Sequence, residues 1–361
     1  MVSQCIVIGA SAGGLEPLKE VVSQLPANLH APVFVVVHTR PYAPSLLPEI
    51  LSHVSPLPAV HPRDGTKIEP AVIYIAPPDH HLLIDDGDLA VKRGPKENGF
   101  RPSIDALFRS AAYAFGPNVI GVVLSGSLND GTSGLWSIKR LGGIAMIQEP
   151  SQAKFESMPR SVLEYVDVDY RLDSSEIGVL LGRLARERSK RAGKNDGMDD
   201  DIKQMAQEVQ IAAGIDVPQE KIFEMGELTP FTCPECQGVL TKIVEGKLTR
   251  FRCHTGHAYT EDALLEEAMR TAGELLWRAT RGFQEIEMLL EHMARHSREV
   301  GYPVSAEKFL KKARELEQQA RNFQAAAVNH ESLSSEKLGE QTRSNPQAPE
   351  EEIKPNPIGN D

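Results

Sequence analysis

The stretch Cys5-Ile6-Val7-Ile8-Gly9-Ala10-Ser11-Ala12-Gly13-Gly14 decides the fold of the amino-terminal half. An apolar run enters a glycine-rich turn, and a helical pattern begins at Leu15. A serine at the apex of such a turn presents its hydroxyl beyond the sheet edge, and G-x-S-x-G is the usual pattern of a nucleophile elbow. The same turn can instead hold a phosphate on the N-terminus of the following helix. Both interpretations are open on these residues alone.

Further apolar runs alternate with helical stretches as far as residue 188. The predicted strands are 6–8, 33–37, 72–75, 119–124 and 144–147, and the predicted helices are 15–25, 103–114 and 133–141. Continuous apolar runs indicate strands that are covered on both faces. The fold class predicted for residues 1–188 is therefore α/β, with a doubly wound, mostly parallel sheet.

Composition excludes several classes of protein. The net charge of −11 argues against a nucleic-acid-binding protein that works by bulk electrostatics. No apolar stretch approaches the roughly 20 residues of a membrane span, and the chain starts without a signal-peptide pattern. We expect a cytoplasmic protein with no membrane insertion.

One of the four cysteines, Cys5, stands alone, and the other three cluster at 233–253, which favours a metal site in a reducing compartment over disulfides.

The carboxy-terminal half divides by composition. We expect a charged linker at 189–229, a Cys/His module at 230–260, a helical hairpin at 261–330 and a disordered tail at 331–361. In the hairpin, apolar residues recur at spacings of three and four, and Gly301-Tyr302-Pro303 separates the two helices. Its apolar stripe is expected mainly to pack on its own partner helix, and docking on a helical receptor or sensor protein is the alternative.

Three polar residues stand at the exits of predicted strands. Ser11 follows the first strand, His38 ends the second, and Asp130 lies six residues beyond Leu124. In open parallel sheets the functional crevice lies at this edge, so the three supply a nucleophile, a base and an orienting carboxylate. Taken singly, His38 can be a structural strand cap, and Asp130 can be an ordinary turn residue in Asn-Asp-Gly. A dinucleotide-binding turn has the pattern G-x-G-x-x-G, and Ser11 stands at the position of its middle glycine. Such a fold also needs an acidic residue at the end of the second strand, where this chain has His38. Both differences weaken the phosphate-binding interpretation.

Residues 4–182 resemble the catalytic domain of the CheB-type protein-glutamate methylesterases of chemotaxis. The matching stretches occur in family order: 8–14, His38, Tyr74-Ile75-Ala76-Pro77-Pro78-Asp79-His80-His81, Arg101-Pro102-Ser103-Ile104-Asp105, 125–131 and Ser157-Met158-Pro159-Arg160. The resemblance implies a Ser-His-Asp triad in which Ser11 is the nucleophile, His38 the base and Asp130 the orienter. It also implies hydrolysis of γ-methyl glutamyl esters on chemoreceptor helices, deamidation of glutamines there, and no catalytic cofactor.

The chain departs from the family pattern beside the nucleophile. Ala12 stands where the family has threonine, and Gly126-Ser127-Leu128 stands where it has Gly-Met-Gly. These departures favour the alternative function, a non-catalytic regulatory or scaffold module that keeps the fold and binds signalling partners. Chemotaxis members of the family usually carry a receiver domain ahead of the catalytic domain, whereas the match in this sequence begins near residue 4. We therefore expect control by a receiver domain to be absent, or to be supplied in trans by a receiver or sensor protein.

Further residues are expected to line the oxyanion region and the substrate cleft. These are Ala12, Gly13, Ser127, Leu128, His81, Arg101 and Met158. His81 is also a rival base, although His38 occupies the better strand exit. Arg101 and Met158 have packing and turn structure as an equal alternative.

The second constellation is Cys233-Pro-Glu-Cys236 followed by Cys253-His-Thr-Gly-His257. Two pairs at this spacing predict a Cys3His zinc site made by Cys233, Cys236, Cys253 and His257, with His254 as a less favourable ligand. Apolar runs at 240–244 and 248–251 flank a Glu-Gly turn, which predicts a small zinc-ribbon hairpin. Four protein ligands leave no open position on the metal, so its predicted role is structural. The alternative is three buried free thiols.

Overall fold

A computed structural model describes residues 2–39, 41, 43–187, 199–215 and 217–331. The tail at 332–361, together with 188–198 of the expected linker, lies outside the described residues. The chain divides into two compact units, with the boundary after Leu264. Within the described ranges, no helix is both long enough and apolar enough to cross a membrane.

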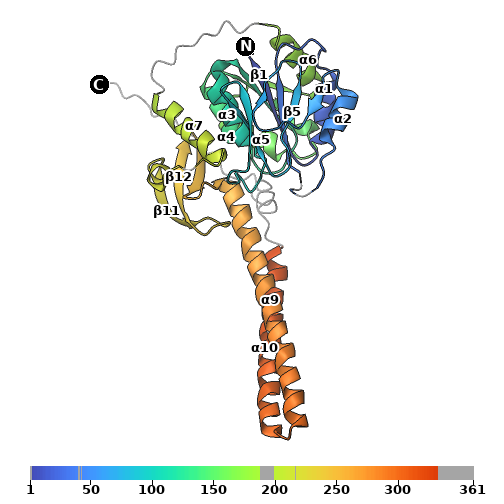
Figure 1. Ribbon diagram of the computed structural model, residues 1–361, viewed down its shortest axis with the longest axis vertical. Coiled ribbons are helices and arrows are strands. Elements are labelled where there is room, and N and C mark those ends of the chain that lie inside the picture. The colour runs from blue at the N-terminus through green and yellow to red at the C-terminus, as the bar shows by residue number, and fades with distance from the viewer. Residues whose placement is uncertain (1, 40, 42, 188–198, 216, 332–361) are drawn as a thin grey trace, which may run out of the picture. The chain divides into compact units, whose positions relative to one another are not determined.

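A seven-stranded sheet forms the centre of the first unit (Figure 1). Its order is β10-β9-β8-β1-β2-β5-β3, and every neighbouring pair is parallel. The strands are β1 (Cys5–Ala10), β2 (Val33–Val37), β3 (Ala59–Val60), β5 (Ile73–Ile75), β8 (Val119–Val123), β9 (Ile144–Gln148) and β10 (Tyr170–Leu172). The predicted α/β class with a mostly parallel sheet is confirmed.

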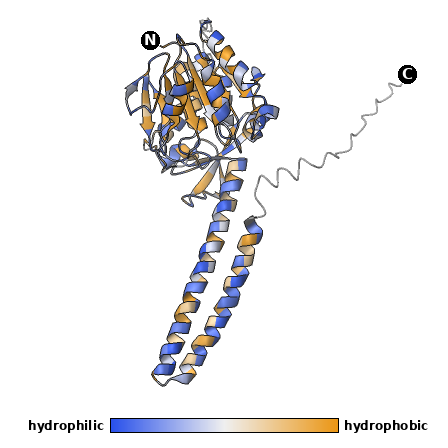
Figure 2. Cartoon of the chain, turned by 90° about the vertical axis from the view of Figure 1, so that its right-hand side faces the viewer, coloured by the Kyte–Doolittle hydropathy of each residue, from blue (hydrophilic) through white to orange (hydrophobic). Residues whose placement is uncertain are grey.

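Helices cover both faces of this sheet. They are α1 (Leu15–Ser23), α2 (Leu47–Val54), α3 (Ile104–Phe115), α4 (Thr132–Arg140), α5 (Ser157–Tyr165) and α6 (Ser174–Leu184). Alternate residues of β1 enter different cores: Ile6 and Ile8 pack with α1 and α6, whereas Cys5 and Val7 pack with α3 and α4. Burial on both faces explains why the strands are continuous apolar runs, which appear as the hydrophobic centre in Figure 2.

A small antiparallel sheet joins the main one. It consists of β4 (Thr66–Lys67), β6 (His81–Asp85) and β7 (Asp88–Lys92), in the order β4-β7-β6. Helix α3 packs against β6. The sequence did not indicate this sheet, because its strands are short and partly charged.

Part of the segment expected to be a linker is helical. It forms α7 (Asp199–Ala212) and α8 (Gln219–Phe223), and α7 packs on α3. Ala212 of α7 and Ala106 of α3 are both nearly fully buried in one apolar cluster. An apolar face and one buried charge, Glu208, therefore attach this segment to the sheet domain.

The Cys/His module also belongs to the first unit. It is a four-stranded antiparallel sheet of β11 (Glu227–Thr232), β12 (Val239–Glu245), β13 (Leu248–Cys253) and β14 (Ala258–Thr260). Strands β12 and β13 pair across the expected Glu-Gly turn. The second unit contains most of α9 (Glu261–Glu299) and all of α10 (Pro303–Glu331). These helices are antiparallel, since Phe283 stacks on Phe323 and His330 bonds the carbonyl of Met269.

Candidate active site

Three loops at the carboxyl edge of the parallel sheet carry the predicted triad residues. Ser11 directly follows β1, His38 directly follows β2, and Asp130 lies in the loop between β8 and α4. Strands β1, β2 and β8 are adjacent in the sheet, with β1 in the middle. Because parallel neighbours end at the same edge, the three side chains are delivered to one place.

The three side chains form a continuous hydrogen-bond chain. Nδ1 of His38 lies 2.9 Å from Oγ of Ser11, and Nε2 of His38 lies 2.8 Å from Oδ2 of Asp130. The side chains of His38 and Asp130 are almost completely buried, at 5% and 1% exposed. Phe100 stacks on the imidazole at 3.7 Å between ring centroids and 7° between planes, which fixes the plane of the ring. A serine, an imidazole and a carboxylate in this order can perform nucleophilic acyl transfer.

Asp130 is ionised in this setting. Burial opposes its charge, but hydrogen bonds from His38 and from the backbone N–H of Ile104 outweigh burial and hold the pKa of Asp130 below its usual value. Ser103 also donates to Asp130, at 3.0 Å, and caps α3 by accepting from Ala106. The N-terminus of α3 therefore holds the carboxylate that orients His38.

A second carboxyl group, Asp105, lies beside Asp130. Burial, and next the charge of Asp130, raise the pKa of Asp105 well above its usual value. Asp105 accepts the backbone N–H groups of Gly131 and Gly134, so it fixes the start of α4 behind Asp130. The amide of Asn98 donates to both carboxyl groups, at 2.9 Å each.

The turn that begins at Ser11 lies beside the turn at 125–128, since the N–H of Ser11 donates to the carbonyl of Ser125 at 3.0 Å, and both turns carry backbone N–H groups that can stabilise an oxyanion. Among the described residues, those of Ala12, Gly13, Ser127 and Leu128 donate no hydrogen bond. The hydroxyl of Ser125 ties the two turns together by donating to the carbonyl of Ala12 at 2.9 Å. Leu128 adopts a left-handed backbone conformation with φ of 62°, a region that suits glycine. Glycine is the residue of the family pattern at this position.

Met158 and Gly126 form the packing beneath the nucleophile. Met158 is fully buried, and its backbone N–H bonds the carbonyl of Gly126 at 3.0 Å. A Cβ on Gly126 would lie 2.0 Å from the sulfur of Met158 and 2.8 Å from Cβ of Ser11. Only glycine fits there, so Met158 acts through packing against the turn that faces Ser11.

His81 is placed differently from the sequence expectation, and Arg101 takes the turn-structure role that was its alternative. His81 is fully buried; its Nε2 lies 2.8 Å from the carbonyl of Pro95, and its Nδ1 accepts from the backbone N–H of Ser103. Burial lowers the pKa of His81, and both ring nitrogens are engaged, so it neither lines an open cleft nor serves as a base. Arg101 makes a forked ion pair with Asp79 and so fixes the loop after β5.

Sequence reasoning missed four residues of this site: Asn98, Phe100, Ser103 and Asp105. Ser103 and Asp105 lie in the quoted Arg-Pro-Ser-Ile-Asp stretch, and a serine before a helical pattern is a capping signal. The roles of Asn98 and Phe100 depend on contacts with residues distant in the chain, and no local pattern marks them.

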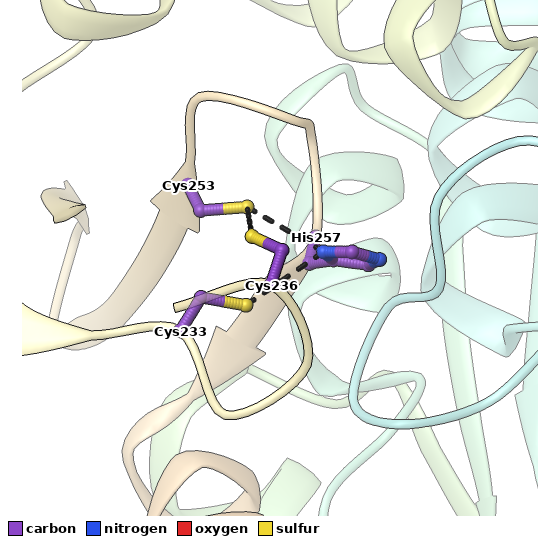
Figure 3. A group of neighbouring side chains, drawn as sticks. All are labelled: Cys233, Cys236, Cys253 and His257. Carbon is purple, nitrogen blue, oxygen red and sulfur yellow. Dashed lines mark hydrogen bonds between the residues drawn. The ribbon is translucent and has the colours of Figure 1, made fainter. Parts of the chain in front are cut away.

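The predicted metal-ligating residues converge at one end of the four-stranded module (Figure 3). Their candidate ligand atoms all lie within 4.8 Å of one another. The sulfurs of Cys236 and Cys253 are 3.6 Å apart, and Nδ1 of His257 lies 3.7 Å from the sulfur of Cys233 and 3.6 Å from that of Cys253. A tetrahedral zinc ion with bonds near 2.3 Å separates sulfurs by about 3.8 Å. The cysteines are free thiols, and the donor set fits such an ion.

The hydrogen-bonded Ser11–His38–Asp130 chain has the order of groups that the class of serine hydrolases uses for acyl transfer. The family model described as CheB methylesterase matches residues 6–181. The chain belongs to this family.

Three relatives show the extent of the similarity. A putative protein-glutamate methylesterase/protein-glutamine glutaminase of Leptospira interrogans is 36% identical over 182 residues, which are 50% of this chain and 94% of that protein. A protein-glutamate methylesterase/protein-glutamine glutaminase of Anaeromyxobacter dehalogenans is 40% identical over 156 residues, 43% of this chain and 46% of its own. The crystal structure of the Thermotoga maritima CheB methylesterase catalytic domain has a TM-score of 0.49 and 32% identity, covering 51% of this chain and all of that one.

Proposed function

We propose that the chain is a serine esterase that demethylates γ-methyl glutamyl esters on chemoreceptor-like signalling proteins and deamidates glutamines at such sites. Membership of the CheB methylesterase family supports the reaction class, and the relatives named above supply the substrate class. The observation that carries the proposal is the unbroken hydrogen-bond chain from Ser11 through His38 to Asp130.

The proposed reaction proceeds in two halves. Nδ1 of His38 accepts the proton of Ser11 as Oγ attacks the ester carbonyl, and Asp130 stabilises the imidazolium that forms. The imidazolium then gives its proton to the departing methoxide, which leaves as methanol. In the second half, His38 takes a proton from a water molecule as that water attacks the acyl-enzyme. The bond between the acyl group and Oγ of Ser11 then breaks, which releases the glutamate carboxylate, and His38 returns the proton to Ser11.

The proposed oxyanion donors are backbone groups of the two turns. The N–H groups of Ala12 and Gly13 in the first turn, and those of Ser127 and Leu128 in the second, donate no hydrogen bond among the described residues. Backbone donors do not depend on side-chain identity, so the departures from the family pattern at Ala12 and Leu128 are compatible with turnover.

The test is methanol release from a methylated receptor fragment, together with fluorophosphonate labelling mapped by mass spectrometry. We expect labelling at Ser11, and we expect Ser11→Ala to abolish both signals. Ser23→Ala, an exposed serine at the end of the next helix, is the matched control and should retain both. Equal methanol release by the wild type and Ser11→Ala would refute the esterase and leave the regulatory module as the function.

We infer that Cys233, Cys236, Cys253 and His257 bind one structural zinc ion. The mutual distances of the ligand atoms support this inference, and four protein ligands leave no position for substrate. Metal analysis of protein purified without chelators should give about one zinc per chain, and Cys236→Ser should lower that ratio. A wild-type ratio near zero would contradict the inference.

A further inference from the structure

Strand β14 of the Cys/His module lies against the residue that bridges Asp105 and Asp130. The backbone N–H of Asn98 donates to the carbonyl of Ala258 at 2.7 Å, and the backbone N–H of Thr260 donates to Oδ1 of Asn98 at 2.9 Å. Asn98 is 7% exposed and has a left-handed φ of 53°. Strand β14 thus fixes both the backbone and the amide plane of Asn98.

The other side of that amide faces the catalytic carboxylate. Nδ2 of Asn98 donates to Oδ1 of Asp130 and to Oδ2 of Asp105. Because both donors of one amide are used between two adjacent carboxyl groups, its orientation limits where Asp130 can lie. A hydrogen-bonded path therefore runs from β14 through Asn98 and Asp130 to His38.

A second contact reaches the residue immediately before Asp130. The hydroxyl of Thr260 donates to Oδ1 of Asn129 at 2.6 Å, and Nδ2 of Asn129 donates to Asp262 at 3.1 Å. Both polar atoms of this buried amide are held, one by Thr260 at the end of β14 and the other by Asp262 in the first turn of α9. The same short segment, 258–262, thus bonds Asn129 directly and reaches Asp130 through Asn98.

The position of this segment is set by the module. His257, a predicted zinc ligand, directly precedes Ala258, and its carbonyl accepts the N–H of Cys253. On the neighbouring strand, Arg252 is 0% exposed and pairs with Glu97, the residue next to Asn98, at 3.0 Å. The loop from Cys253 to His257 and this ion pair hold β14 in register with Asn98.

We propose that Asn98 is a positioning residue for Asp130, and that the metal-loaded Cys/His module, through β14, is the support that keeps Asn98 in place. The inference rests on the proposed esterase function. It predicts that metal loading of the module controls the reactivity of Ser11, although the metal takes no part in the chemistry.

The first test compares variants of the full chain. Asn98→Gly removes the amide while keeping a residue that tolerates the positive φ, and it should lower kcat about 10- to 100-fold with KM within about twofold. Thr260→Val keeps the backbone donor and loses only the hydroxyl, and it should lower kcat about threefold to tenfold. Val239→Thr, on an exposed position of β12, is the control and should match the wild type.

The second test removes the metal from the wild type with a chelator and measures amide hydrogen exchange. The backbone amides of Ile104 and Asp105, which bond Asp130, should lose protection, and re-addition of zinc should restore it. Amides of β1 should stay protected, which distinguishes a local effect from unfolding. Labelling of Ser11 should slow in parallel.

The outcomes separate the two proposals. Wild-type kcat in both Asn98→Gly and Thr260→Val, or unchanged protection at Ile104 and Asp105 after metal removal, would overturn the positioning role. If Asn98→Gly fails to fold, Thr260→Val and the exchange measurement decide the question. Absence of labelling at Ser11 in the metal-loaded wild type would instead refute the esterase itself.

Discussion

Replacing Glu208 by glutamine should destabilise the first unit severely, although this residue lies outside the matched family region. Glu208 of α7 is 1% exposed and pairs with Arg109 of α3 and with Arg250 and Arg252 of β13. Burial opposes its ionisation, but the three guanidinium groups outweigh burial and lower its pKa from 4.5 to about 2. Glu208→Gln would leave one positive charge uncompensated in the interior.

The size of the loss follows from that shift. Lowering the pKa of Glu208 from 4.5 to about 2 corresponds to about 3 kcal/mol of unfolding free energy, and breaking a buried ion pair costs a similar amount. Because the folded pKa is depressed, Glu208 contributes its full stability above pH 4.5 and loses it as the pH falls towards 2. The difference in unfolding free energy between the wild type and Glu208→Gln should therefore be constant from pH 8 to 6 and become smaller in acid.

Urea unfolding, monitored by tryptophan fluorescence, measures this difference in unfolding free energy. The chain has two tryptophans, Trp136 in α4 and Trp277 in α9, so a Trp277→Phe background reports the first unit alone. Glu220→Gln, at an exposed position of α8, is the control and should change the unfolding free energy by less than about 0.5 kcal/mol. A loss below about 1 kcal/mol in Glu208→Gln, or a gap that does not narrow in acid, would refute the assignment of this cluster as a stabilising one.

Three further predictions concern the site. Asp130→Asn should slow fluorophosphonate labelling of Ser11 by about three to four orders of magnitude, because an amide fixes the wrong imidazole tautomer; a change below tenfold would contradict this role. Gly126→Ala should slow labelling at least about tenfold, since its Cβ would clash with Met158 and Ser11, and adding Met158→Ala should recover part of the rate. Leu128→Val should cost about 1 kcal/mol more unfolding free energy than Leu128→Asn in denaturant titrations, because β-branched residues tolerate a positive φ poorly; equal losses would exclude strain at this position.

The strands of the sheet domain were predictable because their signals are local. Strands buried on both faces require continuous apolar runs, and the runs at 6–8, 33–37 and 119–124 became β1, β2 and β8. Ser11 and His38 could be placed at one edge because each directly follows such a run. Strands of two or three residues, such as β4 and β10, offer no periodicity to detect.

The packing of charged residues could not be predicted. Arg250 and Arg252 alternate with apolar residues in β13, a pattern that indicates a solvent-facing side, yet both are at most 2% exposed. Besides Glu245 of β12, their partners come from α7 and from the loop before α3, so the burial exists only once these elements are assembled. His81 illustrates the converse: it lies in a motif with cleft residues, and only the structure shows that both of its nitrogens bond the backbone.

The charges at this junction balance within each part of the chain. In the family region Glu97 and Arg109 pair with each other, and in the following segment Arg250 and Arg252 face Glu208 and Glu245. Each set is neutral by itself, so bringing the two sets together buries no net charge. A substitution that neutralises any one of these residues leaves one charge buried without compensation. In the relative from Leptospira interrogans, the matched 182 residues make up 94% of the protein, so that protein has little sequence left for such a segment. The sheet domain already pairs Glu97 with Arg109 by itself. We therefore expect that the Cys/His module adds support for Asn98 to this domain.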